Sequence, residues 1–215
     1  MQEYKVTVSN IKTEWRQNGK LHREDGPAIE YKNGTTEWYI NGERHRDDGP
    51  AIVSNDGTKQ WWINGKRHRD DGPALISALG LEQWYKNGER HRDDGPAVDD
   101  TDGFKAWYLN GLRHREDGPA HECANGNNSW YLNGLRHRED GPAIEYINGG
   151  KEWWVNGLRH RDNGPAIEWA DGYKEWYING NKYSESEFLA KTQPAKELTV
   201  VEIEKLLGHK VKVVK

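Results

Sequence analysis

The segment His45-Arg-Asp-Asp-Gly-Pro-Ala51 decides the fold, because near-copies of it return every 23 residues along the chain. The copies begin at His22, His45, His68, His91, His114, His137 and His160. A second block, Trp-x-x-Asn-Gly, keeps the same period, and its copies begin at Trp15, Trp38, Trp61, Trp84, Trp107, Trp130, Trp153 and Trp176. A fixed period without insertions predicts a repeat protein in which each unit packs on its neighbours.

Each unit has the sequence of one antiparallel hairpin. In the first full unit, 27–31 and 36–40 are short β-prone segments, and 32–35 is the turn between them. The Asn-Gly or Asp-Gly pair at this tip favours a tight primed turn, because glycine adopts positive φ freely. The next Asn-Gly pair, at 41–42, is expected to end the return strand. Two strands per unit at about 4.8 Å spacing predict an array roughly 70–80 Å long.

The two ends of the chain depart from the repeat. We expect the hairpin array to occupy residues 1–183, with 1–15 as an N-terminal cap hairpin. The C-terminal part, 184–215, is expected to hold a helical cap, a linker and a tail. Two Ser/Thr-x-x-Glu capping boxes predict short helices there, over 185–191 and 202–207.

The composition narrows the class of protein. The chain has 31 basic and 35 acidic residues and a net charge of −4, so we expect no nucleic acid partner, which would favour a clustered basic excess. No apolar run approaches the roughly 20 residues of a transmembrane helix, so no transmembrane segment is expected. Cys123 is the one cysteine, which excludes an intramolecular disulfide and favours a reducing, cytoplasmic location. The 11 Trp and 10 Tyr supply the apolar area for a core.

The segment Trp61-Trp-Ile-Asn-Gly-Lys-Arg-His68, followed by Asp-Gly and a hairpin glycine, resembles the MORN-type repeat in a variant form. The likeness covers about residues 5–183. It implies an all-β array of antiparallel hairpins that acts as a protein- or lipid-binding scaffold. The family usually has Gly after the His, where this chain has Arg, so lipid binding carries over poorly. The segment 196–208 resembles a C-terminal segment of some tailed-phage proteins.

The alternation of a strand separates the aromatic residues of each unit into two columns. The Trp38 column is the same in all eight copies, and we expect it to form the core. The second column comprises Tyr39, Trp62, Tyr85, Tyr108, Tyr131, Trp154 and Tyr177. If one sheet face is uncovered, this second column is an exposed stripe and a candidate binding surface. The alternative, which the sequence leaves open, is that the His-Arg-Asp-Asp segment folds over it.

The recurring His, Arg and acidic residues suggest a metal or catalytic site, but their spacing argues against it. Equivalent histidines should lie about 10 Å apart, whereas the ligands of one zinc ion each lie about 2 Å from it. We therefore expect a structural ladder, in which the second acid caps the Gly-Pro turn and Arg pairs with an acid or stacks on an indole. The sequence predicts no catalytic residue, no metal and no cofactor, and hence no enzyme.

One hairpin differs from the others at its tip. Leu79-Gly80-Leu81 stands where other units hold Asn or Asp before the glycine. An apolar tip costs solubility unless something covers it, so Ile76, Leu79 and Leu81 are the expected contact residues, with local packing as the alternative.

These features favour a non-enzymatic scaffold that binds another protein of unknown identity. The likeness to phage proteins implies a factor that engages or inhibits a host protein in the host cytoplasm. The alternative function is binding of anionic lipid or another polyanion through the Arg columns, although each unit carries nearly as many acids as arginines. The segment 198–207 offers a second contact or a homo-oligomer contact.

Overall fold

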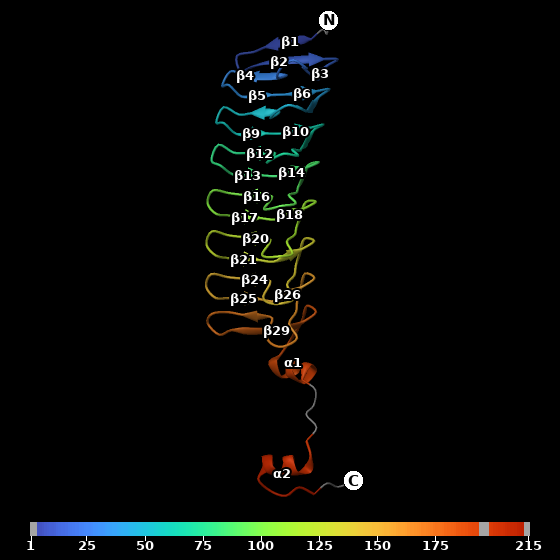
Figure 1. Cartoon of the computed structure of the whole chain (residues 1–215), viewed down its shortest axis with the longest axis vertical. Helices are drawn as coiled ribbons and strands as arrows, with labels where there is room; N and C mark the ends of the chain where they lie inside the picture. The colour runs from blue at the N-terminus through green and yellow to red at the C-terminus, as the bar shows by residue number, and fades with distance from the viewer. Residues whose placement is uncertain (1–3, 194–197, 213–215) are drawn as a thin grey trace.

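The computed structural model describes residues 4–193 and 198–212 of the chain. It is an elongated stack of antiparallel β-hairpins, and two short helices follow the last hairpin (Figure 1). The prediction of an all-β hairpin array with a short helical C-terminal segment is confirmed.

One long sheet runs the length of the array, and its strands pair antiparallel in chain order. Its successive strands are β1 (Lys5–Val8), β2 (Lys12–Gln17), β4 (Ile29–Tyr31), β5 (Thr36–Glu37), β8 (Ile52–Val53), β9 (Lys59–Gln60), β12 (Leu75–Ile76), β13 (Glu82–Gln83), β16 (Val98–Asp99), β17 (Lys105–Ala106), β20 (His121–Glu122), β21 (Asn128–Ser129), β24 (Ile144–Glu145), β25 (Lys151–Glu152), β28 (Ile167–Glu168) and β29 (Lys174–Ile178). At the two ends, β3 (Lys20–Leu21) pairs with β2, and β30 (Asn181–Tyr183) pairs with β29.

Six units contain a second, smaller hairpin, which corrects the expectation of one hairpin per unit. These hairpins pair β6 (Tyr39–Ile40) with β7 (Glu43–Arg44), β10 (Trp62–Ile63) with β11 (Lys66–Arg67), β14 (Tyr85–Lys86) with β15 (Glu89–Arg90), β18 (Tyr108–Leu109) with β19 (Leu112–Arg113), β22 (Tyr131–Leu132) with β23 (Leu135–Arg136), and β26 (Trp154–Val155) with β27 (Leu158–Arg159). The Asn-Gly pair forms their turn, with φ of 53° at Asn41 and 90° at Gly42. Two successive positive φ values define the primed two-residue turn.

The tip of the larger hairpin has a different turn from the one expected. Gly34 has a φ of 93°, but Asn33 is not among the residues with positive φ. The Asn33 side-chain oxygen instead accepts the N–H of Thr35 at 3.0 Å, and the N–H of Tyr31 donates to the carbonyl of Thr35. The expectation of a primed turn at this tip is therefore wrong, and an Asx side chain closes a longer loop.

The fully enclosed column of the array consists of alanines. Seven of them have no exposed surface: Ala28, Ala51, Ala74, Ala97, Ala120, Ala143 and Ala166. The residues that follow them are mostly β-branched and buried, as at Ile29 and Ile144. The Ala51 carbonyl accepts the N–H of Trp38 from the preceding unit at 2.7 Å, and this bond recurs in each unit. The alanine column thus lies where the backbones of consecutive units join.

The Trp38 column, expected to be the core, is half-buried. The alanines occupy the enclosed positions, and their carbonyls accept hydrogen bonds from the backbone N–H groups of these tryptophans. One face of the indole is covered by an arginine, since Arg46 Cζ lies 4.1 Å from the Trp38 ring centroid. The tryptophans therefore form the boundary of the core.

The C-terminal helices begin at the two predicted capping boxes. Helix α1 (Glu185–Thr192) is capped by Ser184, and it buries Phe188 against β29 and β30. Helix α2 (Val200–Leu207) is capped by Thr199 and ends at Gly208, whose φ is 71°. No residue of α2 is buried. Neither of the two described helices has the length and apolar character needed to cross a membrane.

Candidate binding surfaces

The arginine after each histidine lies on the tryptophan of its own unit. This Arg46 column comprises Arg23, Arg46, Arg69, Arg92, Arg115, Arg138 and Arg161, with guanidinium carbons 3.8–4.2 Å from the indole centroids. Arg46 Nε also donates to Asp48 at 2.8 Å, and its Nη1 donates to the Pro50 carbonyl. A Cβ at Gly49 would lie 3.1 Å from Arg46 Cζ, so the glycine of the motif makes room for this arginine.

The expected pairing of the motif's arginine with an acid is present, whereas the expected cap of the Gly-Pro turn by the second acid is not found within the described residues. The second acid accepts a hydrogen bond from the Arg46 column instead. This contact holds the carboxyl pKa below its usual value. The lowered pKa is found at Asp48, Asp71, Asp94, Asp117 and Asp140.

Each histidine joins its unit to the next. The backbone N–H of Asn64 donates to His45 Nδ1 at 3.2 Å, across 19 residues of sequence, and the bond recurs along the array. The same Nδ1 lies 2.9 Å from the Asn64 side-chain oxygen, and Nε2 faces Asp47 at 3.2 Å. The histidines thus hold the Asn-Gly turns of their neighbours.

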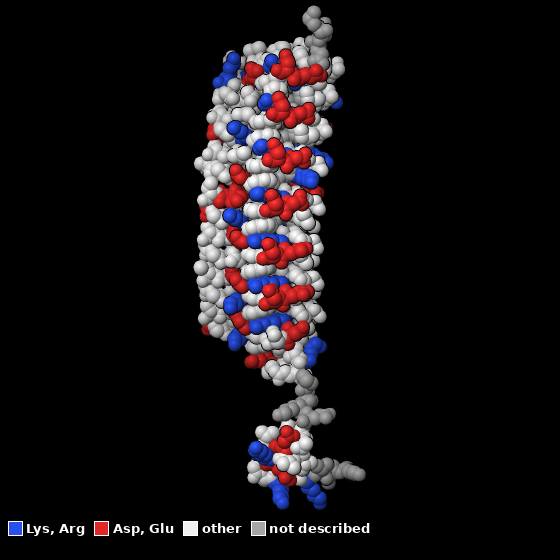
Figure 2. Space-filling model, viewed as in Figure 1, with Lys and Arg blue, Asp and Glu red and all other residues white. Residues whose placement is uncertain are grey.

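The acids of the motif form one column along the array (Figure 2). Their side chains are strongly exposed, at 85% for Asp47 and 80% for Asp48. Between successive acidic loops lie grooves of 430 to 760 Å³, such as the groove lined by Trp130, Arg115 and His137. Within these grooves the acids already face His and Arg side chains of their own unit.

The rings of the second aromatic column are half-buried or buried, and they do not form an open stripe. The column alternates with the arginine that precedes each histidine. Arg44 Cζ lies 5.6 Å from the Tyr39 ring and 5.4 Å from the Trp62 ring of the next unit. The same sandwich is formed by Arg67, Arg90, Arg113, Arg136 and Arg159. The predicted residues Tyr39, Trp62, Tyr85, Tyr108, Tyr131 and Trp154 therefore belong to a mixed arginine–aromatic face and not to an apolar stripe.

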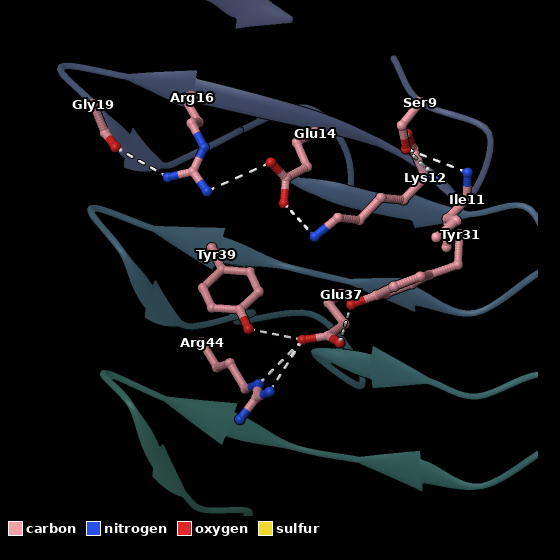
Figure 3. Close-up of polar contacts among 10 residues, drawn as sticks. All are labelled: Ser9, Ile11, Lys12, Glu14, Arg16, Gly19, Tyr31, Glu37, Tyr39 and Arg44. Atoms are coloured by element: carbon pink, nitrogen blue, oxygen red, sulfur yellow. Dashed lines mark hydrogen bonds and ion pairs between the residues drawn. The ribbon is translucent and has the colours of Figure 1, made fainter. Parts of the chain in front are cut away.

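A further column decides the charge of this face, and the sequence analysis missed it. It begins at Glu14, two residues before Arg16, and continues two residues before each ring as Glu37, Gln60, Gln83, Ala106, Ser129, Glu152 and Glu175. Glu37 accepts from the Tyr39 hydroxyl at 2.7 Å and from Arg44 Nη2 at 3.2 Å (Figure 3). Burial and this bond to Glu37 raise the pKa of Tyr39 to about 12.

The carboxylates of this Glu37 column are confined to the ends of the array. Glu152 pairs with Arg159 at 3.3 Å. At the last position, hydrogen bonds from Lys182 and Tyr173 lower the pKa of Glu175 to about 2. In the middle of the array the same column is uncharged. The switch from Glu to Gln, Ala and Ser was visible in the sequence at this spacing.

The irregular hairpin tip has one strongly exposed apolar residue. Leu79 is 86% exposed, whereas Ile76 and Leu81 are half-buried. Leu79 has no side-chain oxygen to close the loop, and the Ser77 hydroxyl accepts the N–H of Leu81 instead, at 2.9 Å. Thr101 of the next tip donates to the Leu79 carbonyl at 3.1 Å. The three residues predicted to contact a partner thus divide into one exposed side chain and two that pack.

Sequence analysis also missed Ile147, which is 71% exposed at another tip. The signal was its position, because Lys32 and Asn55 occupy the same place in earlier units. Cys123, which follows β20, has its Sγ 3.8 Å from His121 Nε2. Within residues 4–193 and 198–212, no three His, Cys, Asp or Glu side chains are placed to hold a metal ion.

The chain matches no protein-family model and no curated protein. The MORN-type resemblance and the phage resemblance therefore remain predictions from the residues quoted above.

Proposed function

We propose that the chain is a non-enzymatic scaffold that binds another protein and that the Leu79 tip sets the choice of partner. The observation that supports this proposal is the 86% exposure of Leu79 at a position where other units hold Asn or Asp. A leucine held out on a rigid loop presents apolar area that a partner pocket can bury. The repeated units by themselves give equivalent surfaces, which supply avidity but no fixed register on a partner.

The proposal also covers the origin of the protein and the compartment in which it binds its partner. The resemblance of 196–208 to tailed-phage proteins supports a factor that engages a host protein in the host cytoplasm. The exposed apolar side chains of α2, including Val201 at 73% and Leu206 at 73%, support a second contact or a homo-oligomer contact through this helix.

The test compares two variants as baits in a host lysate. In the L79N variant, an Asn stands where Asn33 closes the first tip, so the fold is expected to persist with an unchanged melting temperature. In the I147N control, an exposed apolar tip residue is removed from a different unit and replaced by the residue found at Asn55.

We expect the wild-type chain and I147N to capture the same protein, and L79N to bind it with an affinity lowered by about 1–3 kcal/mol. Equal capture by L79N and the wild-type chain, measured at equal bait concentration, would show that the Leu79 tip does not choose the partner.

A further inference from the structure

The arginines in the middle of the arginine–aromatic face form no ion pair with a carboxylate of residues 4–193 or 198–212. Arg44 and Arg159, near the ends of the array, pair with Glu37 and Glu152. Four arginines between them have no carboxylate partner within the described residues, and we call them the central arginine row: Arg67, Arg90, Arg113 and Arg136. Whether an arginine of this face is paired with a carboxylate thus depends on its unit along the array.

The partners of the row are neutral. Arg67 Nη2 donates to Gln60 at 3.0 Å, and Arg113 Nε donates to the Tyr108 hydroxyl at 3.2 Å. The Nε atoms of Arg67 and Arg90 are buried and have no hydrogen-bond acceptor. A docked anion cannot reach these buried Nε atoms. Because a guanidinium carries five N–H donors and no acceptor, the capacity left for an anion lies in the Nη groups of these half-buried side chains.

The rings hold the row rigid. Each guanidinium lies between two rings of consecutive units, at centroid distances of 5.1 to 6.0 Å in the central row. Consecutive groups should be about 10 Å apart, since each unit adds two strand spacings. Like charges held at this separation repel one another, and a bound anion relieves that repulsion.

The geometry favours an extended acidic peptide over the other polyanions. The rings are sandwiched by arginine on both sides, so they are not free to stack bases of a nucleic acid. A membrane surface is attracted by a broad basic surface, whereas this chain has a net charge of −4 and a parallel column of exposed acids. An extended peptide follows a single row of charges, and its side chains recur about every 9–10 Å at three-residue spacing in a polyproline conformation.

We propose that the central arginine row binds an extended acidic segment of a partner protein, with one carboxylate on each guanidinium. This surface is separate from the Leu79 tip, and the inference does not depend on Leu79.

The chain itself supplies the variants that test the row. Gln60 accepts from Trp62 Nε1 and Arg67, as Glu152 accepts from Trp154 Nε1 and Arg159. The double variant Q60E/Q83E therefore adds the carboxylates that the end units already use, and it neutralises half of the row without removing an arginine. The control is N33D/N125D, which adds the same charge at two hairpin tips where Asp56 and Asp102 stand in other units.

The assay is fluorescence anisotropy at low salt with a labelled peptide of repeated Glu-Pro-Pro triplets. We expect Q60E/Q83E to weaken binding about tenfold, because exposed ion pairs are individually worth up to about 1 kcal/mol. N33D/N125D should bind as the wild-type chain does. The reverse variant E37Q/E152Q, which leaves Arg44 and Arg159 without carboxylates, should bind more tightly.

Three results would overturn the inference. The first is no peptide binding by the wild-type chain or by E37Q/E152Q. The second is equal weakening by Q60E/Q83E and N33D/N125D, which would mean that only total charge matters. The third is that phosphatidylserine vesicles or oligothymidine bind in preference to the peptide and respond to Q60E/Q83E. The L79N variant should bind the peptide normally, so failure at the row and failure at the Leu79 tip are distinguishable.

Discussion

The stacking of Arg92 on Trp84 predicts a measurable coupling between the two side chains. Arg92 Cζ lies 4.0 Å from the indole centroid, and the arginine also bonds to Asp94 at 2.9 Å and to the Pro96 carbonyl at 3.3 Å. The stack should contribute about 0.5–1 kcal/mol, since the arginine is partly exposed. The side chain of Asp94 is 83% exposed, so its ion pair with Arg92 should contribute little to stability.

The Pro96 hydrogen bond should contribute about 1 kcal/mol, so that R92Q costs about 2 kcal/mol in total. A double-mutant cycle with R92Q and W84L isolates the stack, and we expect a coupling energy of about 0.5–1 kcal/mol. Denaturant unfolding followed by far-ultraviolet circular dichroism gives the four free energies. G95A provides an independent route, because its methyl group would approach Arg92 Cζ to 3.0 Å and displace the stack. A coupling energy of zero, with G95A as stable as the wild-type chain, would refute the stacking argument.

Two further predictions concern the repeat register and the aspartates that pair with the Arg46 column. Deletion of 62–84 joins Trp61 to Tyr85 and continues every column, so the protein should stay folded, and its longest dimension in small-angle scattering should shorten by about 10 Å. Deletion of 62–73 removes about half a unit, so it should break the register and abolish cooperative unfolding of the units that follow. A folded half-unit variant would contradict the assignment of the columns. The lowered carboxyl pKa of five aspartates means that they stabilise the folded state at pH above about 4, and that this contribution is lost as the pH falls below it. The groups are Asp48, Asp71, Asp94, Asp117 and Asp140. In acid titrations of the unfolding free energy, D94N should therefore give a shallower decline below pH 4 than the wild-type chain, and an unchanged slope would speak against the contact with the arginine.

The period of 23 residues was sufficient to predict a stack of antiparallel hairpins, because two turns and a proline in so short a unit leave no room for helices. The second hairpin of each unit was not predicted. Its strands have two residues each, which is too short for alternation to appear in the sequence. Both turns contain Asx-Gly in every unit except the one with Leu79-Gly80, and the sequence alone does not show which pair takes positive φ at both residues.

The candidate surfaces were predicted less well, because their contacts join different units. The arginine columns and the aromatic columns were both visible, but Arg44 reaches Trp62, which lies 18 positions later in the sequence. No local pattern specifies that approach. Gly49 illustrates the same difficulty, since its place in the motif suggested a turn, whereas the structure shows that it accommodates Arg46.

The short reach of the contacts between units has a consequence for how the chain acquires its structure. The bond from Asn64 to His45 spans 19 residues, the bond from Asn55 to Thr35 spans 20, and the bond from Thr101 to Leu79 spans 22. These contacts join neighbouring units only, so lengthening the array adds no long loop to close, and folding can proceed by addition to an existing end. At a synthesis rate of about 5–20 residues per second, a ribosome would release one unit every few seconds, and each could dock on the previous one as it emerges.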